Sequence, residues 1–490
     1  MSALDISQEP AESVLVVGGG VAGITAALNL ADAGARVYLV DDAPSIGGLM
    51  ARLDKTFPTN DCSICIEAPM MYSVARHPNI ALLTGTEIRR VEGAAPRFRV
   101  RLVQRPRFVD AEKCKGCGKC AEACPVSVPD ELDGPIGGKR KLISIPFPQA
   151  VPNVYVVDDR CRYCKMFDRG ACIGACKVDC SQCRECQIAR CVVACRKEGA
   201  EAVLLWQRER VLDIEVRSIV LAVGAEPFTP SEPHFGLGLH PDVLTNLQFE
   251  RLLNAGGPTA GRLVRPSDGS KVRSVVWIQC AGRGRRGGLG YCSRVCCMIA
   301  VKQSILAREH ELGLEAAVLY GELQPYGKGF HEFHARAKRA GVEFIKGRPG
   351  RVSRDPFSGR LRVRFEDMES GRLGELEADI VVLSAGLSPP PRVKKLAKQL
   401  RIELDERGFV KERDPLGAPL ETSVEGVYVC GTATGPADIS ETVARASAAA
   451  LLALGGGRGR SSFSGAAQGV ESGTSGFGGV PRTVERGACP

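Results

Sequence analysis

Residues 13–41 read SVLVVGGGVAGITAALNLADAGARVYLVD, and this stretch decides the fold. An apolar strand over 13–17 leads into a glycine-rich turn, after which apolar residues recur with helical spacing as far as Gly34. A second apolar strand then ends at Asp41. This order of strand, helix and strand predicts a βαβ unit, from which parallel α/β sheets are built.

The glycines of this turn have the spacing of a phosphate-binding fingerprint. Gly18 permits the tight turn, Gly20 lets the backbone approach a pyrophosphate, and Gly23 allows close packing of the helix. The helix N-terminus favours phosphate because its amides are unpaired and its dipole end is positive. Asp41 follows at the distance where an acidic side chain accepts hydrogen bonds from a ribose. The sequence therefore predicts a dinucleotide site.

The composition predicts a globular protein that binds metal through cysteine. Its 490 residues, 44% of them hydrophobic, allow two or three domains with sizeable cores. A net charge of +9 is mild and only 5% of residues are aromatic, which argues against nucleic-acid binding. The N-terminus lacks signal-peptide features and no apolar run could span a membrane, so we expect a soluble cytoplasmic protein. Its 21 cysteines, thirteen of them between Cys114 and Cys195, then indicate metal centres.

Residues 113–125, KCKGCGKCAEACP, follow the bacterial ferredoxin pattern C-x2-C-x2-C-x3-C-P. We expect its thiolates to hold [4Fe–4S] clusters, and a second run is needed because the fourth cysteine serves the other cluster. Three cysteines at 180–186 have this rhythm, with Cys195 as the remote ligand. The predicted ligands of the insert are Cys114, Cys117, Cys120, Cys124, Cys180, Cys183, Cys186 and Cys195. The cysteines left over, which could bind a third cluster, zinc or nothing, are Cys161, Cys164, Cys172, Cys176 and Cys191.

Another cysteine group lies in residues 275–297, VVWIQCAGRGRRGGLGYCSRVCC. Cys280 ends an apolar strand, and Cys292 and Cys296 would share one face of a helix that begins near Ser293. Thiolates that converge from a loop and a helix start suit an iron–sulfur cluster or zinc. The predicted ligands of this metal site are Cys280, Cys292, Cys296 and Cys297.

Two further motifs are less specific. Cys62 and Cys65 form a CxxC that could be a redox dithiol or a pair of structural cysteines, and the sequence leaves both open. A GxGxxG follows the strand at 272–279, but its glycines would weaken the helix start that a second nucleotide site needs. We interpret as accidental the motif made by Gly282, Gly284 and Gly287.

The extended glycine pattern resembles that of FAD-binding flavoproteins with two dinucleotide domains. Ala27, Leu30 and Gly34 carry this resemblance beyond the glycine turn itself. IVLAVGAEP at 219–227 and IVVLSAGLSP at 380–389 look like the crossings between the two domains of such proteins. The resemblance therefore implies FAD as the dinucleotide.

Residues 424–454 look like the closing FAD segment of the same proteins, with Thr432 where thioredoxin-reductase-like enzymes usually have Asp. The implied fold class is α/β, a thioredoxin-reductase-like two-dinucleotide-domain fold with an inserted α+β ferredoxin-type domain. The implied FAD contacts are Gly18, Gly20, Gly23, Asp41 and Gly431. The expected segments are 1–105, 201–272 and 376–454 for the FAD domain, 106–200 for the insert, 273–375 for the second α/β domain and 455–490 for a disordered tail.

Together these residues resemble the family of the heterodisulfide reductase A subunit over residues 13–454. The most specific elements are SIGGLMARLDKTFPTNDCSIC (45–65), the ferredoxin insert, PQAVPNVYVVD (148–158), and QCAG followed by YCSRVCC. The resemblance implies FAD and about three [4Fe–4S] clusters, one of them held by the four cysteines of 275–297. It also implies a hetero-oligomer with other redox subunits, such as a heterodisulfide-reductase-like B and C pair. The chain departs from the family in its irregular second cysteine run.

The resulting hypothesis is an oxidoreductase subunit that relays electrons between [4Fe–4S] clusters and FAD to a partner catalytic subunit. No acid–base or nucleophilic residue is required, because the cofactors supply the chemistry. One alternative is an NAD(P)H-dependent flavin disulfide reductase that uses Cys62 and Cys65 as its dithiol. Another is a zinc-stabilised binding scaffold with a vestigial flavin fold.

Overall fold

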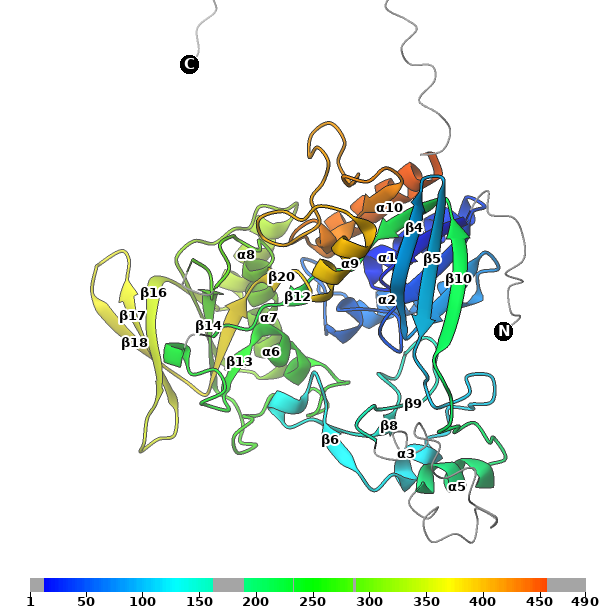
Figure 1. Ribbon diagram of the computed structural model, residues 1–490. Helices are drawn as coiled ribbons and strands as arrows, with labels where there is room; N and C mark the ends of the chain where they lie inside the picture. The colour runs from blue at the N-terminus through cyan, green and yellow to red at the C-terminus, as the bar shows by residue number, and fades with distance from the viewer. Residues whose placement is uncertain (1–12, 162–188, 232, 285–287, 456–490) are drawn as a thin grey trace, which may run out of the picture. The chain divides into compact units, whose positions relative to one another are not determined.

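The computed structural model describes residues 13–161, 189–231, 233–284 and 288–455. Its first sheet has five parallel strands in the order β21-β11-β1-β2-β3 (Figure 1). The predicted βαβ unit is present, because β1 and β2 pair in parallel and are joined by α1 (Val21–Asp32). The strands are β1 (Ser13–Val17), β2 (Arg36–Asp41), β3 (Ile80–Thr84), β11 (Ser218–Leu221) and β21 (Val427–Val429).

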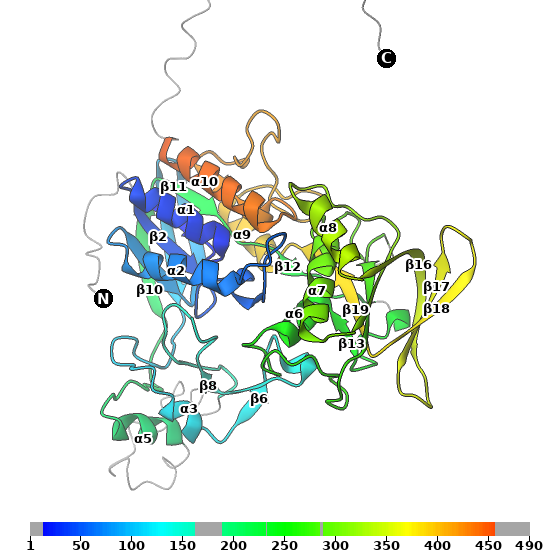
Figure 2. The same cartoon turned by 180° about the vertical axis from the view of Figure 1, so that it is seen from behind.

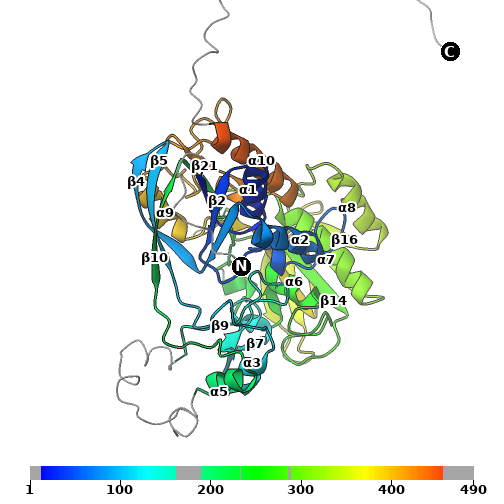
Figure 3. The same cartoon turned by 90° about the vertical axis from the view of Figure 1, so that its right-hand side faces the viewer.

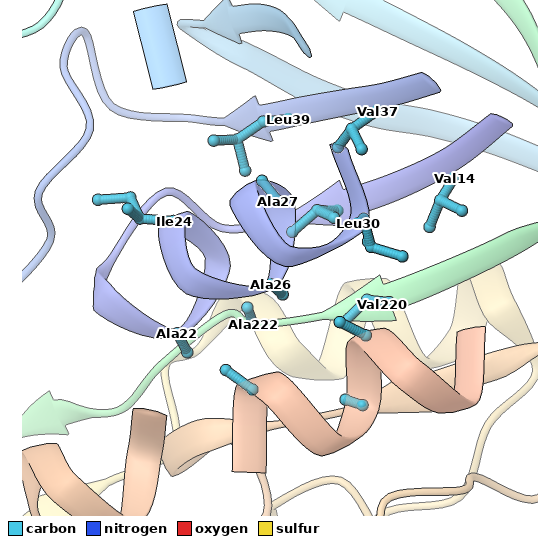
Figure 4. Packing of buried hydrophobic residues seen from close by; sticks show 14 of the residues in the cluster. Val14, Ala22, Ile24, Ala26, Ala27, Leu30, Val37, Leu39, Val220 and Ala222 are labelled. Carbon is cyan, nitrogen blue, oxygen red and sulfur yellow. The ribbon is translucent and has the colours of Figure 1, made fainter. Parts of the chain in front are cut away.

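Side chains alternate across this sheet and therefore contribute to two cores. Val14 and Leu39 belong to the core that also contains side chains of α1, α2 (Ser63–Arg76) and α10 (Ile439–Gly455) (Figure 4). Leu15 and Val40 belong to the other core, which they share with the antiparallel sheet β10-β5-β4. The strands of this second sheet are β4 (Thr86–Ala94), β5 (Arg97–Gln104) and β10 (Arg210–Val216).

The ferredoxin-like insert lies between two neighbouring strands, because β5 ends at Gln104 and its antiparallel partner β10 begins at Arg210. Short elements pack around a small core that contains Cys120 and Cys195. The helical elements are α3 (Lys119–Ala123), η3 (Gly134–Ile136) and α5 (Arg190–Lys197). The strand pairs are β6 (Ser127–Pro129) with β7 (Lys139–Lys141), and β8 (Ile143–Ser144) with β9 (Val156–Val157).

A seven-stranded sheet in the order β13-β19-β14-β15-β16-β17-β18 forms the second α/β part (Figure 2). Its first five strands are parallel, β17 pairs antiparallel with β16, and β18 pairs antiparallel with β17. The strands are β13 (Val243–Thr245), β14 (Ser274–Ala281), β15 (Glu315–Tyr320), β16 (Glu343–Arg354), β17 (Leu361–Asp367), β18 (Leu373–Ala378) and β19 (Ile380–Ala385).

Helices cover one face of this sheet (Figure 3). Val275 and Trp277 of β14 pack against α6 (Asn246–Leu253), α7 (Cys296–His310) and α8 (Phe330–Arg339). Val276 and Ile278 belong to a separate core with side chains of β16, β17 and β18. The strand expected at 272–279 is therefore present as β14.

The sheet membership differs from the expected segments at two places. β13 lies within the segment 201–272 and β19 within the segment 376–454, yet both belong to the seven-stranded sheet. The reason is pairing: β19 lies between β13 and β14 in parallel register with each. The chain therefore crosses between the two sheets at β12 (Glu226–Pro227) and β20 (Leu387–Ser388), which pair with each other.

The remaining elements are η2 (Met50–Arg52), η5 (Pro233–Phe235), η6 (Gly431–Ala433) and α9 (Arg392–Leu400). Across the described part of the chain, each helix is too short or too polar to cross a membrane. The tail was predicted over 455–490; Gly455 is the last residue of α10, and residues 456–490 lie outside the described residues.

Candidate functional site

The glycine turn forms a close-packed cradle at the N-terminus of α1. A Cβ at Gly18, where φ is +108°, would lie 2.2 Å from the carbonyl oxygen of Ala222. A Cβ at Gly23 would lie 1.7 Å from the carbonyl oxygen of Gly18, so only glycine fits either position. At Gly20 a Cβ would come no closer than 3.7 Å to Gly48, which leaves room beside the backbone. The cradle fits the pyrophosphate of a dinucleotide at a helix N-terminus.

Asp41 ends β2, and its carboxylate binds the turn itself. Oδ2 accepts a hydrogen bond from the Gly19 amide at 2.5 Å, and Oδ1 accepts one from the Ala43 amide at 2.7 Å. Burial raises the pKa of Asp41, while these two amide bonds oppose the shift. Each carboxylate oxygen can accept a further hydrogen bond. Asp41 can therefore hold the turn and still receive a ribose hydroxyl.

The closing segment meets the same cradle. Gly431 has φ +63°, and a Cβ there would lie 2.8 Å from the side chain of Ala22 in the first turn of α1. The hydroxyl of Thr432 lies 3.9 Å from the position a Cβ would take on Gly224, at the crossing 219–227. The chemistry of this donor set, backbone amides with one buried carboxylate, fits a flavin adenine dinucleotide.

Four cysteines line one cavity in the seven-stranded part, and we call it the four-cysteine cavity. Cys280 comes from the end of β14, where its φ is +55°, and the other three come from the loop and first turn of α7. The cavity also borders Ser384 and Gly386 at the end of β19. It therefore lies at the carboxyl ends of two adjacent parallel strands, where open α/β sheets bind ligands. Its cysteines are Cys280, Cys292, Cys296 and Cys297, the four that the sequence singled out.

The helix start was predicted too early. α7 begins at Cys296 rather than near Ser293, so Cys292 is a loop residue and not a helical i,i+4 partner of Cys296. The physical reason is local: Arg294 has φ +61°, which a helix cannot continue, and the Ser293 hydroxyl instead accepts a hydrogen bond from the Leu387 amide at 2.9 Å. Cys292 therefore lines the cavity from the loop before α7 and not from a helix.

The thiols of the four-cysteine cavity sit in an apolar setting that disfavours thiolate. Burial raises the pKa of Cys296 strongly, and neighbouring Cys297, Cys280 and Cys292 raise it further. Burial raises the pKa of Cys297 to about 11. Burial also raises the pKa of Cys280, while a hydrogen bond from Arg283 opposes the shift. Crowded thiols of this kind lose their protons when a metal centre binds them.

One arginine joins this cavity to the closing segment. The Arg294 amide donates to the Cys292 sulfur at 3.3 Å. Its guanidinium donates to Glu441 at 2.9 Å, in the first turn of α10, and to the Pro436 carbonyl at 2.7 Å. α10 in turn packs beside α1. The four-cysteine cavity and the dinucleotide cradle are thus linked through a short run of side chains.

A second cavity, which we call the insert cavity, brings together cysteines from both ends of the insert. Cys120 lies in α3 and Cys195 in α5, and the Cys195 sulfur also accepts a hydrogen bond from the Ala202 amide at 3.2 Å. Burial raises the pKa of Cys120 to about 12, and Cys195 and Cys114 raise it further. The cysteines of the insert cavity are Cys114, Cys117, Cys120 and Cys195. The structure therefore places Cys195 beside the first run, the arrangement of a two-cluster ferredoxin.

Cys191 is a residue that the sequence left unassigned. Burial raises its pKa to about 11, and the nearby Cys161 and Cys124 raise it further. Cys124 is the fourth cysteine of the first run, which serves the other cluster in two-cluster ferredoxins. The spacing Cys191-x3-Cys195 repeats that of Cys120-x3-Cys124 and was the signal that could have revealed Cys191.

Three predicted ligands of the insert, Cys180, Cys183 and Cys186, lie outside the described residues. Three of its unassigned cysteines, Cys164, Cys172 and Cys176, also lie outside them. Among the described residues, no group of three or more His, Cys, Asp and Glu side chains is arranged to hold a metal ion.

Three family models match the chain at the features described above. Residues 13–67 match FAD dependent oxidoreductase, 107–130 match 4Fe-4S binding domain, and 288–450 match Pyridine nucleotide-disulphide oxidoreductase. The chain therefore carries the sequence signatures of an FAD domain and of a 4Fe–4S domain.

Curated relatives extend this match along nearly the whole chain. The iron-sulfur A subunit of CoB–CoM heterodisulfide reductase from Methanocaldococcus jannaschii is 44% identical over 453 residues, 91% of this chain. The chain is a relative of the heterodisulfide reductase A subunit. The A subunit of the H(2)/formate:CoB-CoM heterodisulfide,ferredoxin reductase of Methanococcus maripaludis is 44% identical over 442 residues, 90% of this chain. The A subunit of the ferredoxin:CoB-CoM heterodisulfide reductase of Methanosarcina acetivorans is 38% identical over 484 residues, 92% of this chain.

The chain spans 65%, 63% and 57% of the length of these three heterodisulfide reductase subunits. Among solved structures, thioredoxin reductase from T. acidophilum is 15% identical with a TM-score of 0.46, covering 91% of this chain and 98% of that one. The expected α/β fold class, with two largely parallel sheets and a ferredoxin-type insert, is confirmed by the sheet topology and the family models. The family resemblance drawn from residues 45–65 and the cysteine motifs is confirmed as well.

Proposed function

We propose that this chain is an electron-transfer oxidoreductase subunit that binds FAD at the glycine cradle and [4Fe–4S] clusters in the four-cysteine cavity and the insert. The observation that carries the proposal is the convergence of Cys280, Cys292, Cys296 and Cys297 on one cavity. That cavity occupies the sheet edge where a nucleotide would otherwise bind. A one-electron centre held there would be joined to the FAD cradle through Arg294 and Glu441.

The residues of the chain bind and tune, while bound FAD and clusters would supply the redox chemistry. Gly18, Gly20 and Gly23 bring α1 against the pyrophosphate, and Asp41 orients the ribose. Arg283 donates a hydrogen bond to the Cys280 sulfur and adds a positive charge beside the cavity. Both effects favour the reduced, more negative state of a cluster.

In the insert, we propose one cluster on Cys114, Cys117, Cys120 and Cys195, which line the insert cavity. A second cluster would include Cys124 and Cys191, because both pack against the same small core of the insert. Cys161 belongs to that core and is a further candidate ligand of the second cluster. With the four-cysteine cavity, this makes about three clusters.

The partner would be another redox subunit of a cytoplasmic complex, such as a heterodisulfide-reductase-like B and C pair, which would carry the substrate-reducing centre. The relatives named above are subunits of reductases for the CoB–CoM heterodisulfide, and this supports a multisubunit assembly.

The test is electron paramagnetic resonance of protein purified without oxygen and reduced with dithionite. Cys296→Ser should remove the signal of one cluster and lower the iron content by about four atoms, with FAD content unchanged. Cys191→Ser should remove a different signal. The matched control is Cys430→Ala, a fully buried cysteine outside both cavities, which should keep the full iron content. Colourless protein that contains zinc and no flavin would support the scaffold alternative instead.

A further inference from the structure

Cys62 and Cys65 are bonded to each other and belong to neither cavity. The S–S bond closes a loop at the start of α2. Cys62 is the N-cap of the helix, and its sulfur accepts a hydrogen bond from the Cys65 amide at 3.3 Å. The other described cysteines are not disulfide-bonded, so this pair differs from all of them.

The pair is anchored to the segment that leaves the dinucleotide cradle. The Gly47 amide donates to the Gly19 carbonyl at 2.7 Å, which ties this segment to the glycine turn. The buried Ser63 hydroxyl, between the two cysteines, donates to the carbonyl of Leu53 at 2.7 Å. Ile64 packs against the core that contains the first turn of α1, and α2 lies beside α1 (Figure 2). The start of α2, which carries the disulfide, is thus tied to the segment that contacts the glycine turn.

The same loop is held from the other side by the seven-stranded part. Lys302 of α7 donates to the Lys55 carbonyl at 2.7 Å, and the Asp54 amide donates to Glu250 of α6 at 3.0 Å. α7 is also the helix whose first turn carries Cys296. The loop that leads to the disulfide therefore contacts the same helix that carries Cys296.

The chemistry at this position suits reversible opening of the S–S bond. A sulfur at a helix N-cap is stabilised as thiolate by the amide it accepts from and by the positive dipole end. Cys65 is exposed, so its sulfur can be reached by a molecule in solution.

We propose that Cys62 and Cys65 form a two-electron dithiol/disulfide centre that exchanges electrons with the flavin and with small disulfides in solution. This inference rests on FAD binding in the proposed function. In the first step the Cys62–Cys65 S–S bond would accept two electrons and two protons from reduced FAD and open to two thiols, which would leave the flavin oxidised. In the second step an external disulfide R–S–S–R is cleaved by exchange at Cys65, which releases two R–SH and restores the Cys62–Cys65 bond.

The test counts electrons in a reductive titration of the anaerobic holoprotein. Cys62→Ser keeps an N-cap oxygen in place of the sulfur and so should preserve α2. It should accept two electrons fewer than the wild type, with FAD and iron contents unchanged. Cys430→Ala should accept the wild-type number. Equal counts in Cys62→Ser and the wild type would overturn the proposal, whereas absence of flavin from the wild type would instead refute the proposed function.

Alkylation supplies an independent readout. With iodoacetamide and mass spectrometry, Cys65 should be labelled only after the flavin has been reduced. Addition of oxidised glutathione should then return it to the unlabelled state. Labelling in the oxidised protein, or none after full flavin reduction, would each contradict a redox-active pair.

Discussion

Replacement of Lys302 by methionine should destabilise the seven-stranded part by several kcal/mol. Lys302 and Glu250 form an ion pair at 2.5 Å, and their side chains are only 2% and 1% exposed. Glu250 also accepts hydrogen bonds from Gln303 at 2.8 Å and from the Asp54 amide at 3.0 Å. Methionine keeps the bulk of the side chain but leaves the carboxylate without its counter-charge.

The magnitude follows from the geometry of the pair. At an effective dielectric constant of about 20, two unit charges at 2.5 Å attract by roughly 7 kcal/mol. The variant no longer desolvates the ammonium group, which offsets several kcal/mol of that loss. The net cost expected for breaking a buried pair is about 3–5 kcal/mol. Lys411→Met is the control, because its pair with Glu403 has a similar distance of 2.7 Å but side chains 54% and 60% exposed, so its cost should stay below about 1 kcal/mol.

Trp277 provides a local probe for the assay. It is fully buried, and its indole nitrogen donates to Gln303 at 3.2 Å, the residue next to Lys302. Urea unfolding followed by tryptophan emission, with Trp206 replaced by Phe in every variant, therefore reports on the region of the pair. Equal unfolding free energies for Lys302→Met and Lys411→Met, within about 0.5 kcal/mol, would refute the stabilising role of the buried pair.

Three further outcomes are expected. Gly23→Ala should abolish FAD retention, because its Cβ would lie 1.7 Å from the Gly18 carbonyl oxygen. Gly290→Ala, whose Cβ would have nothing within 4 Å, should retain FAD. Equal flavin absorbance in both variants would contradict FAD binding at the cradle. Burial raises the pKa of Glu67 well above 4.5, so the wild type loses stability as the pH rises from the pKa of Glu67 in the unfolded chain toward its pKa in the folded protein. The melting temperature of Glu67→Gln relative to wild type should therefore increase from pH 5 to pH 8. A constant difference between the two proteins would contradict the raised pKa. Arg283→Gln should lower the midpoint potential of one cluster, measured by paramagnetic resonance, and an unchanged potential would show that its charge is irrelevant.

Most of the fold could be predicted from patterns of residues that are close in sequence. The glycines and apolar strands of residues 13–41 predict a βαβ unit, because a turn, a helix or a strand of this kind depends mainly on residues that are close in sequence. The unit is present as β1, α1 and β2. The apolar runs of β14, β15 and β16 likewise indicate strands from the local sequence. Convergence of the four cysteines from β14 and the start of α7 was also predicted, although the helix begins later than expected.

Features that depend on distant pairing were not predictable in the same way. β13 and β19 join the seven-stranded sheet through register with each other and with β14, which no local pattern encodes. The buried Lys302–Glu250 pair joins α6 and α7, and in sequence each residue resembles an ordinary solvated position on a helix. The role of Cys191 was left open, because its spacing to Cys195 is a local signal but its position near Cys124 and Cys161 joins distant parts of the chain.

The central claim is that this chain binds FAD together with iron–sulfur clusters. Its most direct test is the FAD, iron and acid-labile sulfide content of protein purified without oxygen. The account predicts one FAD and at least about eight iron atoms per chain with equal sulfide, since each [4Fe–4S] cluster contributes four. Protein with FAD but fewer than about eight irons, or with zinc in place of iron, would contradict it.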